Sequence, residues 1–117
     1  LQQDGDLFQF PNALWVLGHL ELPLLNVVHN NQSLYNSTNH RIQLASYRGR
    51  DASLERAMIG TGLDDPVPDW ASVAEAFGVD GYGPVEDPDE LQPVLTEAWE
   101  AAKAGRPVLV DVVSQAR

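Results

Sequence analysis

The sequence predicts an α/β protein: one three-layer domain with a central parallel sheet flanked by helices. Helix-length apolar segments alternate with short runs rich in Val and Leu along the chain. These short runs are nearly continuous in apolar residues, which is typical of parallel strands buried on both faces. A chain of 117 residues, 44% of them hydrophobic, can bury one core. We therefore expect residues 1–117 to form a single domain, N-terminally truncated from a longer polypeptide.

The first predicted helix runs from Pro11 to Glu21, with proline suited to its first turn. Its apolar residues recur at helical spacing, at Phe10, Ala13, Leu14 and Leu17. Trp15 and Val16 add apolar surface on other sides of the helix. We therefore expect this helix to be buried between layers, as a helix that covers a parallel sheet would be.

Polar residues flank this helix and the strand predicted after it. Asp4-Gly5-Asp6 comes before the helix, and Asn30-Asn31 follows a buried strand at 24–28. A crossover between parallel strands returns the chain to the edge of the sheet that it left. If a strand ends just before Asp4, then Asp4 and Asn31 lie side by side at the carboxyl edge, where open α/β sheets bind ligands.

The segment from Gln32 to Leu63 is polar and locally positive, because it holds four of the seven basic residues: Arg41, Arg48, Arg50 and Arg56. We expect a short helix after Ser33 and another over 52–59, capped by Asp51 and ended by Gly60. Two interpretations stay open. The segment closes over an anionic substrate, or it is a solvated loop whose charges offset the acidic remainder.

Asp69 is a suitable cap for a third helix, which Gly78 would end. The apolar stripe of this helix consists of Trp70, Val73, Ala74 and Phe77. Residues 79–85 then form a brief strand or an extended link. The prediction is a helix packed on the sheet and followed by a third sheet segment.

The last predicted helix has two competing caps, Asp87 and Asp89. Pro93 favours the later start, because proline is disruptive deep inside a helix. The apolar face consists of Leu91, Val94, Leu95, Ala98 and Ala102. Gly105 ends this helix, and 108–113 is another buried strand.

Charge and composition exclude several classes of function. Seventeen acidic and seven basic residues give a net charge of −10, which disfavours nucleic acid and anionic membranes as partners. No apolar run approaches the roughly 18 residues of a membrane span. The lack of cysteine excludes disulfides, thiol nucleophiles and thiolate metal sites. A cytoplasmic origin fits this composition.

The spacing from Asp4 to Asn31 resembles the motif of thiamine-diphosphate enzymes, Gly-Asp-Gly followed by Asn-Asn, with Gln3 in place of the first glycine. Further likeness to acetolactate synthase and benzoylformate decarboxylase lies in Ala13-Leu14-Trp15, Leu22-Pro23 and 27–31. The segment 105–112 resembles the closing strand of their C-terminal domains. The resemblance therefore implies a C-terminal cofactor-binding domain with the thiamine-diphosphate-binding fold.

The resemblance also implies a ligand set for thiamine diphosphate and Mg²⁺. Asp4, Asn31 and the carbonyl of Ser33 would bind the metal, and the amides of Gly5, Asp6 and Leu7 would donate to a phosphate. One carboxylate suits this role better than three, because extra negative charge would repel the diphosphate. We expect the Asp6 side chain to point away from the diphosphate.

The implied activity is that of a lyase or transferase acting on 2-oxo acids, in a homodimer or homotetramer. Acetolactate-synthase-like decarboxylation and carboligation of pyruvate is the first hypothesis, and a benzoylformate or other 2-oxo acid decarboxylase is the alternative. Another alternative is a scaffold that has lost cofactor binding, supported by Gln3 and Asp6. In the family the activating carboxylate lies in another domain, so we expect residues 1–117 alone to be inactive and to need the remaining domains.

Overall fold

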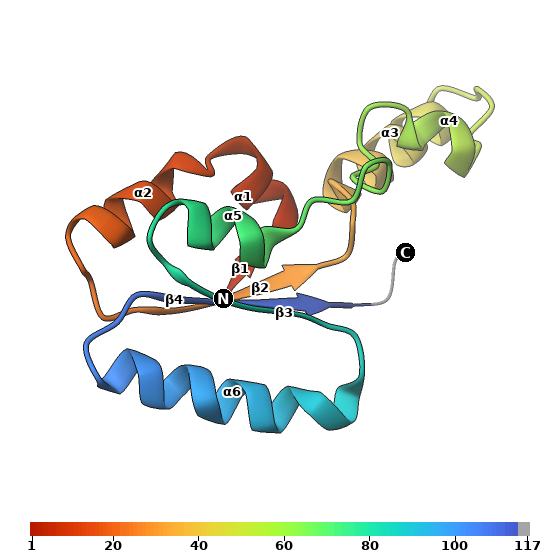
Figure 1. Ribbon diagram of the computed structural model, residues 1–117. Coiled ribbons are helices and arrows are strands. Elements are labelled where there is room, and N and C mark those ends of the chain that lie inside the picture. Colours follow the sequence, from red (N-terminus) through yellow and green to blue (C-terminus); the bar gives the residue numbers. More distant parts are fainter. Residues whose placement is uncertain (115–117) are drawn as a thin grey trace.

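The computed structural model describes residues 1–114, which form a four-stranded, fully parallel sheet (Figure 1). Its strands, in the spatial order β1-β2-β4-β3, are β1 (Gln2–Gln3), β2 (Leu25–Asn30), β4 (Val108–Val113) and β3 (Asp80–Val85). Gln3 pairs with His29, so β1 and β2 end at the same edge. The α/β prediction is confirmed, including a strand directly before Asp4.

Helices cover both faces of the sheet and make the three predicted layers (Figure 1). On one face lie α1 (Asp4–Gln9), α2 (Asn12–His19) and α5 (Trp70–Ala76), and on the other lies α6 (Pro88–Lys103). Alternate residues of β4 serve the two faces, because Leu109 packs in one apolar core and Val108 and Val110 pack in the other. The interior strand β4 is therefore buried between two cores.

The first helical segment differs from the prediction in two ways. It consists of two helices, α1 and α2, that meet at Phe10 and Pro11, because the main-chain N–H of Phe10 closes the end of α1 and proline cannot continue its hydrogen bonding. Trp15 is 52% exposed and Phe10 is 64% exposed, whereas Leu14 is buried. The expectation of a buried helix is wrong for residues 1–114, where the side of α2 that carries Leu14 is covered and the side that carries Trp15 is exposed.

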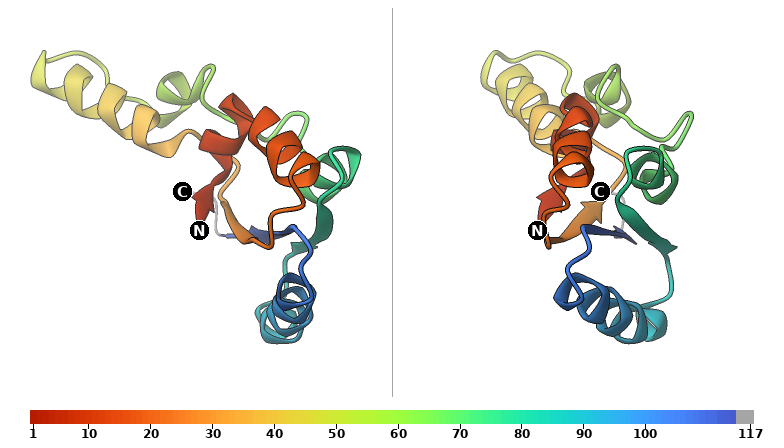
Figure 2. Two further views of the ribbon diagram at one scale, coloured as in Figure 1. Left: turned by 90° about the vertical axis from the view of Figure 1, so that its left-hand side faces the viewer. Right: turned by 60° about the vertical axis from the view of Figure 1, so that its left-hand side comes forward.

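Residues 34–63, here called the arm, project beyond the carboxyl edge of the sheet (Figures 1 and 2). They contain α3 (Tyr35–Tyr47) and α4 (Leu54–Met58), so the helix expected to be short has 13 residues. The predicted cap Asp51 is wrong: Ser53 caps α4 by accepting from the Arg56 N–H, while the Asp51 carboxylate pairs with the Arg56 side chain at 3.1 Å. Gly60 adopts φ +72° just after α4, as a helix-ending glycine does.

Of the predicted N-caps of α5 and α6, the first is confirmed and the second is wrong. Asp69 caps α5 as predicted, accepting from the Ser72 N–H at 2.9 Å. The α6 helix starts at the earlier of its two possible caps, Asp87, whose carboxylate accepts from the Asp89 N–H at 2.9 Å. Pro88 is favourable at the first helical position, and this preference outweighs the disruption by Pro93 in the second turn.

Candidate functional site

Asp4 and Asn31 meet at the carboxyl edge of β1 and β2. Asp4 directly follows β1 as the first residue of α1, and Asn31 directly follows β2. The main-chain N–H of Ser33 donates to both side chains, to Asp4 Oδ2 at 3.2 Å and to Asn31 Oδ1 at 3.1 Å. One amide group therefore ties together two side chains that are far apart in sequence, as the crossover argument predicts.

Asp4 keeps one carboxylate oxygen free in a buried position. Asp4 is 1% exposed, and its Oδ1 has no hydrogen-bond partner among the described residues. Burial raises the pKa of Asp4, while main-chain hydrogen bonds from Gly5, Ser33, Gln32 and Asn31 act in the opposite direction. An unsatisfied buried carboxylate oxygen is costly unless a donor or cation occupies it. The residues present therefore fit a divalent cation.

The loop after β2 also has a main-chain carbonyl that its bridge hydrogen bonds do not use. Ser33 and Gly62 form an isolated antiparallel bridge, in which the Leu34 N–H donates to the Thr61 carbonyl and the Leu63 N–H donates to the Gln32 carbonyl, each at 2.8 Å. Neither bond uses the Ser33 carbonyl. An acid, an amide oxygen and this carbonyl are oxygen ligands of the kind that Mg²⁺ prefers.

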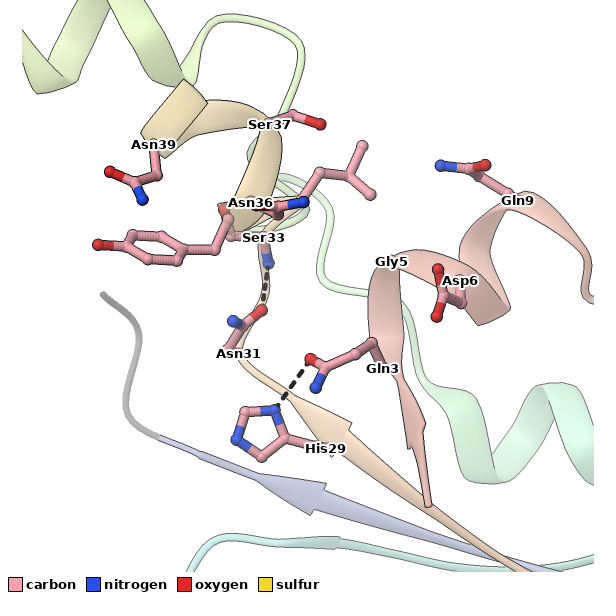
Figure 3. Close-up of a pocket in the computed structure, with 12 residues that line it drawn as sticks. Gln3, Gly5, Asp6, Gln9, His29, Asn31, Ser33, Asn36, Ser37 and Asn39 are labelled. Atoms are coloured by element: carbon pink, nitrogen blue, oxygen red, sulfur yellow. Dashed lines mark hydrogen bonds between the residues drawn. The ribbon is translucent and has the colours of Figure 1, made fainter. Parts of the chain in front are cut away.

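A pocket of about 560 Å³ opens beside these groups and is lined by Gly5, Asp6, Asn31 and Ser33 (Figure 3). Gly5 and Asp6 belong to the first turn of α1, where main-chain N–H groups have no partner within the helix. Leu7 is placed differently: its side chain is fully buried in the core, and its amide is the first that α1 can use internally. The structure thus brings together every predicted site residue except Leu7.

The Asp6 side chain is exposed and lies beyond Gly5, on the side away from Asn31 (Figure 3). The Asp6 side chain therefore points as expected. That its carboxylate avoids the diphosphate stays a prediction. Gln3 reaches the same pocket from β1, and its Oε1 lies 3.1 Å from His29 Nδ1 (Figure 3).

Sequence reasoning missed most of the pocket wall. Besides Gln3 and His29, amide and hydroxyl side chains from two helices line it: Gln9, Asn36, Ser37 and Asn39. The pairing of Gln3 with His29 follows from parallel register, so this pair was within reach of the sequence. The residues on α3 were not, because their position depends on how the arm leaves the sheet.

A second buried carboxylate, Asp111 on β4, lies near this edge and is 1% exposed. Burial raises the pKa of Asp111 to about 6, a hydrogen bond from the Asn30 side chain opposes the shift, and the charges of Asp69 and Asp4 add to it. No pattern in the sequence marked Asp111, because it stands within an apolar strand.

The arrangement defines an α/β domain with an oxygen-rich candidate site where two parallel strands end. The family "Thiamine pyrophosphate enzyme, C-terminal TPP binding domain" matches residues 3–112, and the chain belongs to this family. Comparison with curated proteins gave no match. The recognition of a thiamine-diphosphate-binding C-terminal domain is therefore confirmed. None of the helices within residues 1–114 has the length and apolar character needed to cross a bilayer.

Proposed function

We propose that this domain binds the diphosphate of thiamine diphosphate through Mg²⁺ held by Asp4, Asn31 and the carbonyl of Ser33. The observation that carries the proposal is the buried Oδ1 of Asp4, which has no hydrogen-bond partner within residues 1–114, in a side chain that shares the Ser33 N–H with Asn31. A cation there would satisfy this oxygen and favour the charged form of the carboxylate. The single carboxylate also leaves positive charge on the metal for the phosphate oxygens.

The first turn of α1 would assist by donating to a phosphate. The first-turn N–H groups of Gly5 and Asp6 have no acceptor within the helix, and the Gly5 N–H also contacts the Asp4 carboxylate. The Leu7 N–H is the first in position to donate within α1. Gly5 also packs against the arm, because a Cβ at this position would meet the end of the Leu34 side chain, which would have to turn aside.

The parent protein, in this proposal, is a thiamine-diphosphate-dependent lyase or transferase that acts on 2-oxo acids. When bound, the cofactor would supply a carbon nucleophile and an electron sink for a 2-oxo acid. Residues 1–114 position the diphosphate end and expose the pocket to the rest of the protein. Acetolactate-synthase-like chemistry is the first choice, in a cytoplasmic homodimer or homotetramer with its remaining domains.

Two alternatives differ in measurable ways. A benzoylformate or other 2-oxo acid decarboxylase would turn over an aromatic 2-oxo acid faster than pyruvate in the intact parent protein. A scaffold would keep the fold but bind no cofactor, and Gln3 and Asp6 are the residues that favour it. Residues 1–117 alone should turn over neither pyruvate nor benzoylformate, because no glutamate here takes the activating role found in the family.

Calorimetric titration of the 117-residue chain with thiamine diphosphate, with and without Mg²⁺, tests the metal proposal. The wild type should bind only with Mg²⁺, and Asp4→Asn should weaken this binding by at least about tenfold, since a metal ligand is lost. Asp6→Asn is the matched control, because it makes the same carboxylate-to-amide change two residues away in α1. It should bind as well as the wild type or better.

Equal binding by Asp4→Asn and wild type would refute the ligand set, as would a loss confined to Asp6→Asn. No binding by a folded wild-type chain would favour the scaffold. Circular dichroism of each variant separates loss of binding from loss of the fold.

A further inference from the structure

The loop that carries the proposed metal ligands has an unfavourable backbone conformation. Gln32, between Asn31 and Ser33, adopts φ +56°, in the left-handed region that non-glycine residues seldom occupy. Such a conformation persists where its surroundings enforce it. The Gln32 N–H donates to Asn30 Oδ1 at 3.1 Å, so the Asn30 side chain is one of the groups that hold the loop.

The Asn30 amide is itself held in one orientation. Its Nδ2 donates to Asp111 Oδ2 at 3.4 Å, and Asn30 and Asp111 are each 1% exposed. A main-chain N–H can only donate and a carboxylate can only accept. The Asn30 oxygen therefore faces the Gln32 N–H, and the Asn30 NH₂ group faces the Asp111 carboxylate. A chain of contacts thus runs from β4 through Asn30 to Gln32.

The backbone of Asp111 is held in place by the strands on either side of β4. It pairs with Val28 in the register between β4 and β2. On its other side the main chain of Gly83, at φ +112°, packs so closely that an added Cβ would lie 3.2 Å from the Asp111 Cβ. Backbone on both sides therefore sets where the carboxylate can reach.

A carboxylate is an unfavourable choice at this position on packing grounds. Leu109, two residues earlier on the same face of β4, packs in the apolar core. Asp111 Oδ1 has no hydrogen-bond partner among the described residues, so burial of this group is only partly compensated. An apolar side chain would avoid this cost but would leave the Asn30 amide without its acceptor.

We propose that Asp111 is a positioning residue that acts through Asn30 to hold the 31–33 loop in the conformation that presents the metal ligands. The role of the loop in metal binding rests on the proposed function, whereas the holding of the loop does not. Partners behind metal ligands commonly matter for affinity, since they orient the ligating groups.

Four variants of the 117-residue chain test this proposal. Asp111→Asn keeps an acceptor for Asn30, and Asp111→Leu removes it at similar volume. Asn30→Asp places two carboxylates face to face. The exchange Asn30→Asp with Asp111→Asn restores the hydrogen bond between positions 30 and 111 with donor and acceptor reversed, while position 30 still accepts from the Gln32 N–H. Each is measured by hydrogen exchange of the Gln32 and Ser33 amides without metal, and by Mg²⁺-dependent binding of thiamine diphosphate in calorimetry.

The Gln32 amide should exchange at the wild-type rate in Asp111→Asn and roughly tenfold or more faster in Asp111→Leu and Asn30→Asp. The exchanged pair should recover most of this protection. Mg²⁺ affinity should follow the same order, with a loss of about tenfold in the two disrupted variants. Amides in the middle of β4 report whether the sheet stays intact.

Unchanged Gln32 exchange in a folded Asp111→Leu would overturn the proposal, and so would failure of the exchanged pair to recover protection. If Asp111→Leu does not fold, Asn30→Asp and its exchanged partner decide the question alone. If the wild type binds no Mg²⁺ and cofactor, the proposed function fails, and amide exchange still shows whether Asp111 holds the loop.

Discussion

The sheet with its covering helices and the arm are stabilised by different interactions. In the sheet region, side chains from three layers bury two continuous apolar cores. In the arm, hydrogen bonds join the segments: Thr38 Oγ1 and Thr61 Oγ1 form a buried hydroxyl pair at 2.7 Å, and the Arg41 guanidinium donates to the carbonyls of Ala57 and Ile59. The molecule is elongated because the arm projects, with extents of 55 × 31 × 22 Å.

Because of this difference, the two regions should respond differently to substitutions that remove a contact. Burial of apolar surface couples strands and helices from the whole chain. The loss of a core contact therefore lowers the free energy of global unfolding. A few hydrogen bonds on a projecting segment couple only their neighbours, so their loss should open that segment locally. Three substitutions, each with a matched control, test this contrast.

Leu109→Ala should have the largest effect. Leu109 is fully buried on the central strand β4, and its truncation should lower the free energy of unfolding by about 2–5 kcal/mol through lost burial and a cavity. Leu44→Ala makes the same truncation in the arm, where the side chain is 49% exposed. It should change the free energy of unfolding by less than about 1 kcal/mol. Urea denaturation measures both, and similar values would contradict the contrast between the two regions.

Asp111→Asn should stabilise the protein at neutral pH. The folded pKa of about 6 lies above the usual 3.8, so the folded state binds more protons between these values, and stability falls as pH rises through this window. The shift corresponds to a penalty of about 3 kcal/mol that persists above pH 6. The variant should remove most of this penalty and flatten the pH dependence from 4 to 6.

Denaturation at pH 4, 5, 6 and 7.5 without Mg²⁺ measures this effect. Asp51→Asn in the arm is the control, because its side chain is 63% exposed and should matter by less than about 1 kcal/mol. Destabilisation by Asp111→Asn at pH 7.5 would show that the charged carboxylate is favourable in the fold.

Thr61→Val should have the smallest and most local effect. Thr61 is 2% exposed, and its hydroxyl donates to the Ala57 carbonyl at 3.2 Å and pairs with Thr38, so its removal should cost about 1–3 kcal/mol. Hydrogen exchange should accelerate in α3 and α4, while amides of β4 keep the wild-type rate.

Thr96→Val is the control for Thr61→Val, because the exposed Thr96 hydroxyl also donates to a carbonyl four residues earlier, at 2.8 Å. It should have almost no effect on exchange. Equal acceleration in β4 and in the arm after Thr61→Val would mean that the arm unfolds together with the sheet.

Much of the sheet was predictable because its signals are local. The strand at 108–113, the Asp69 cap and the apolar face of α6 follow from period and capping alone. The errors lie where a local preference competes with another contact. Asp51 resembles a cap but pairs with the Arg56 side chain instead, and Trp15 resembles a core residue but lies on the exposed side of α2.

The meeting of Asp4 with Asn31 was determined by the sequence, because a helix and a strand between them force a return to the same edge of a parallel sheet. The residues that surround that pair depend on long-range packing instead. Asp111 approaches Asn30 from a strand that comes late in the chain, and the arm brings Asn36 and Asn39 over the pocket. Such contacts depend on strand order and on the path of a polar segment, which no periodic pattern encodes.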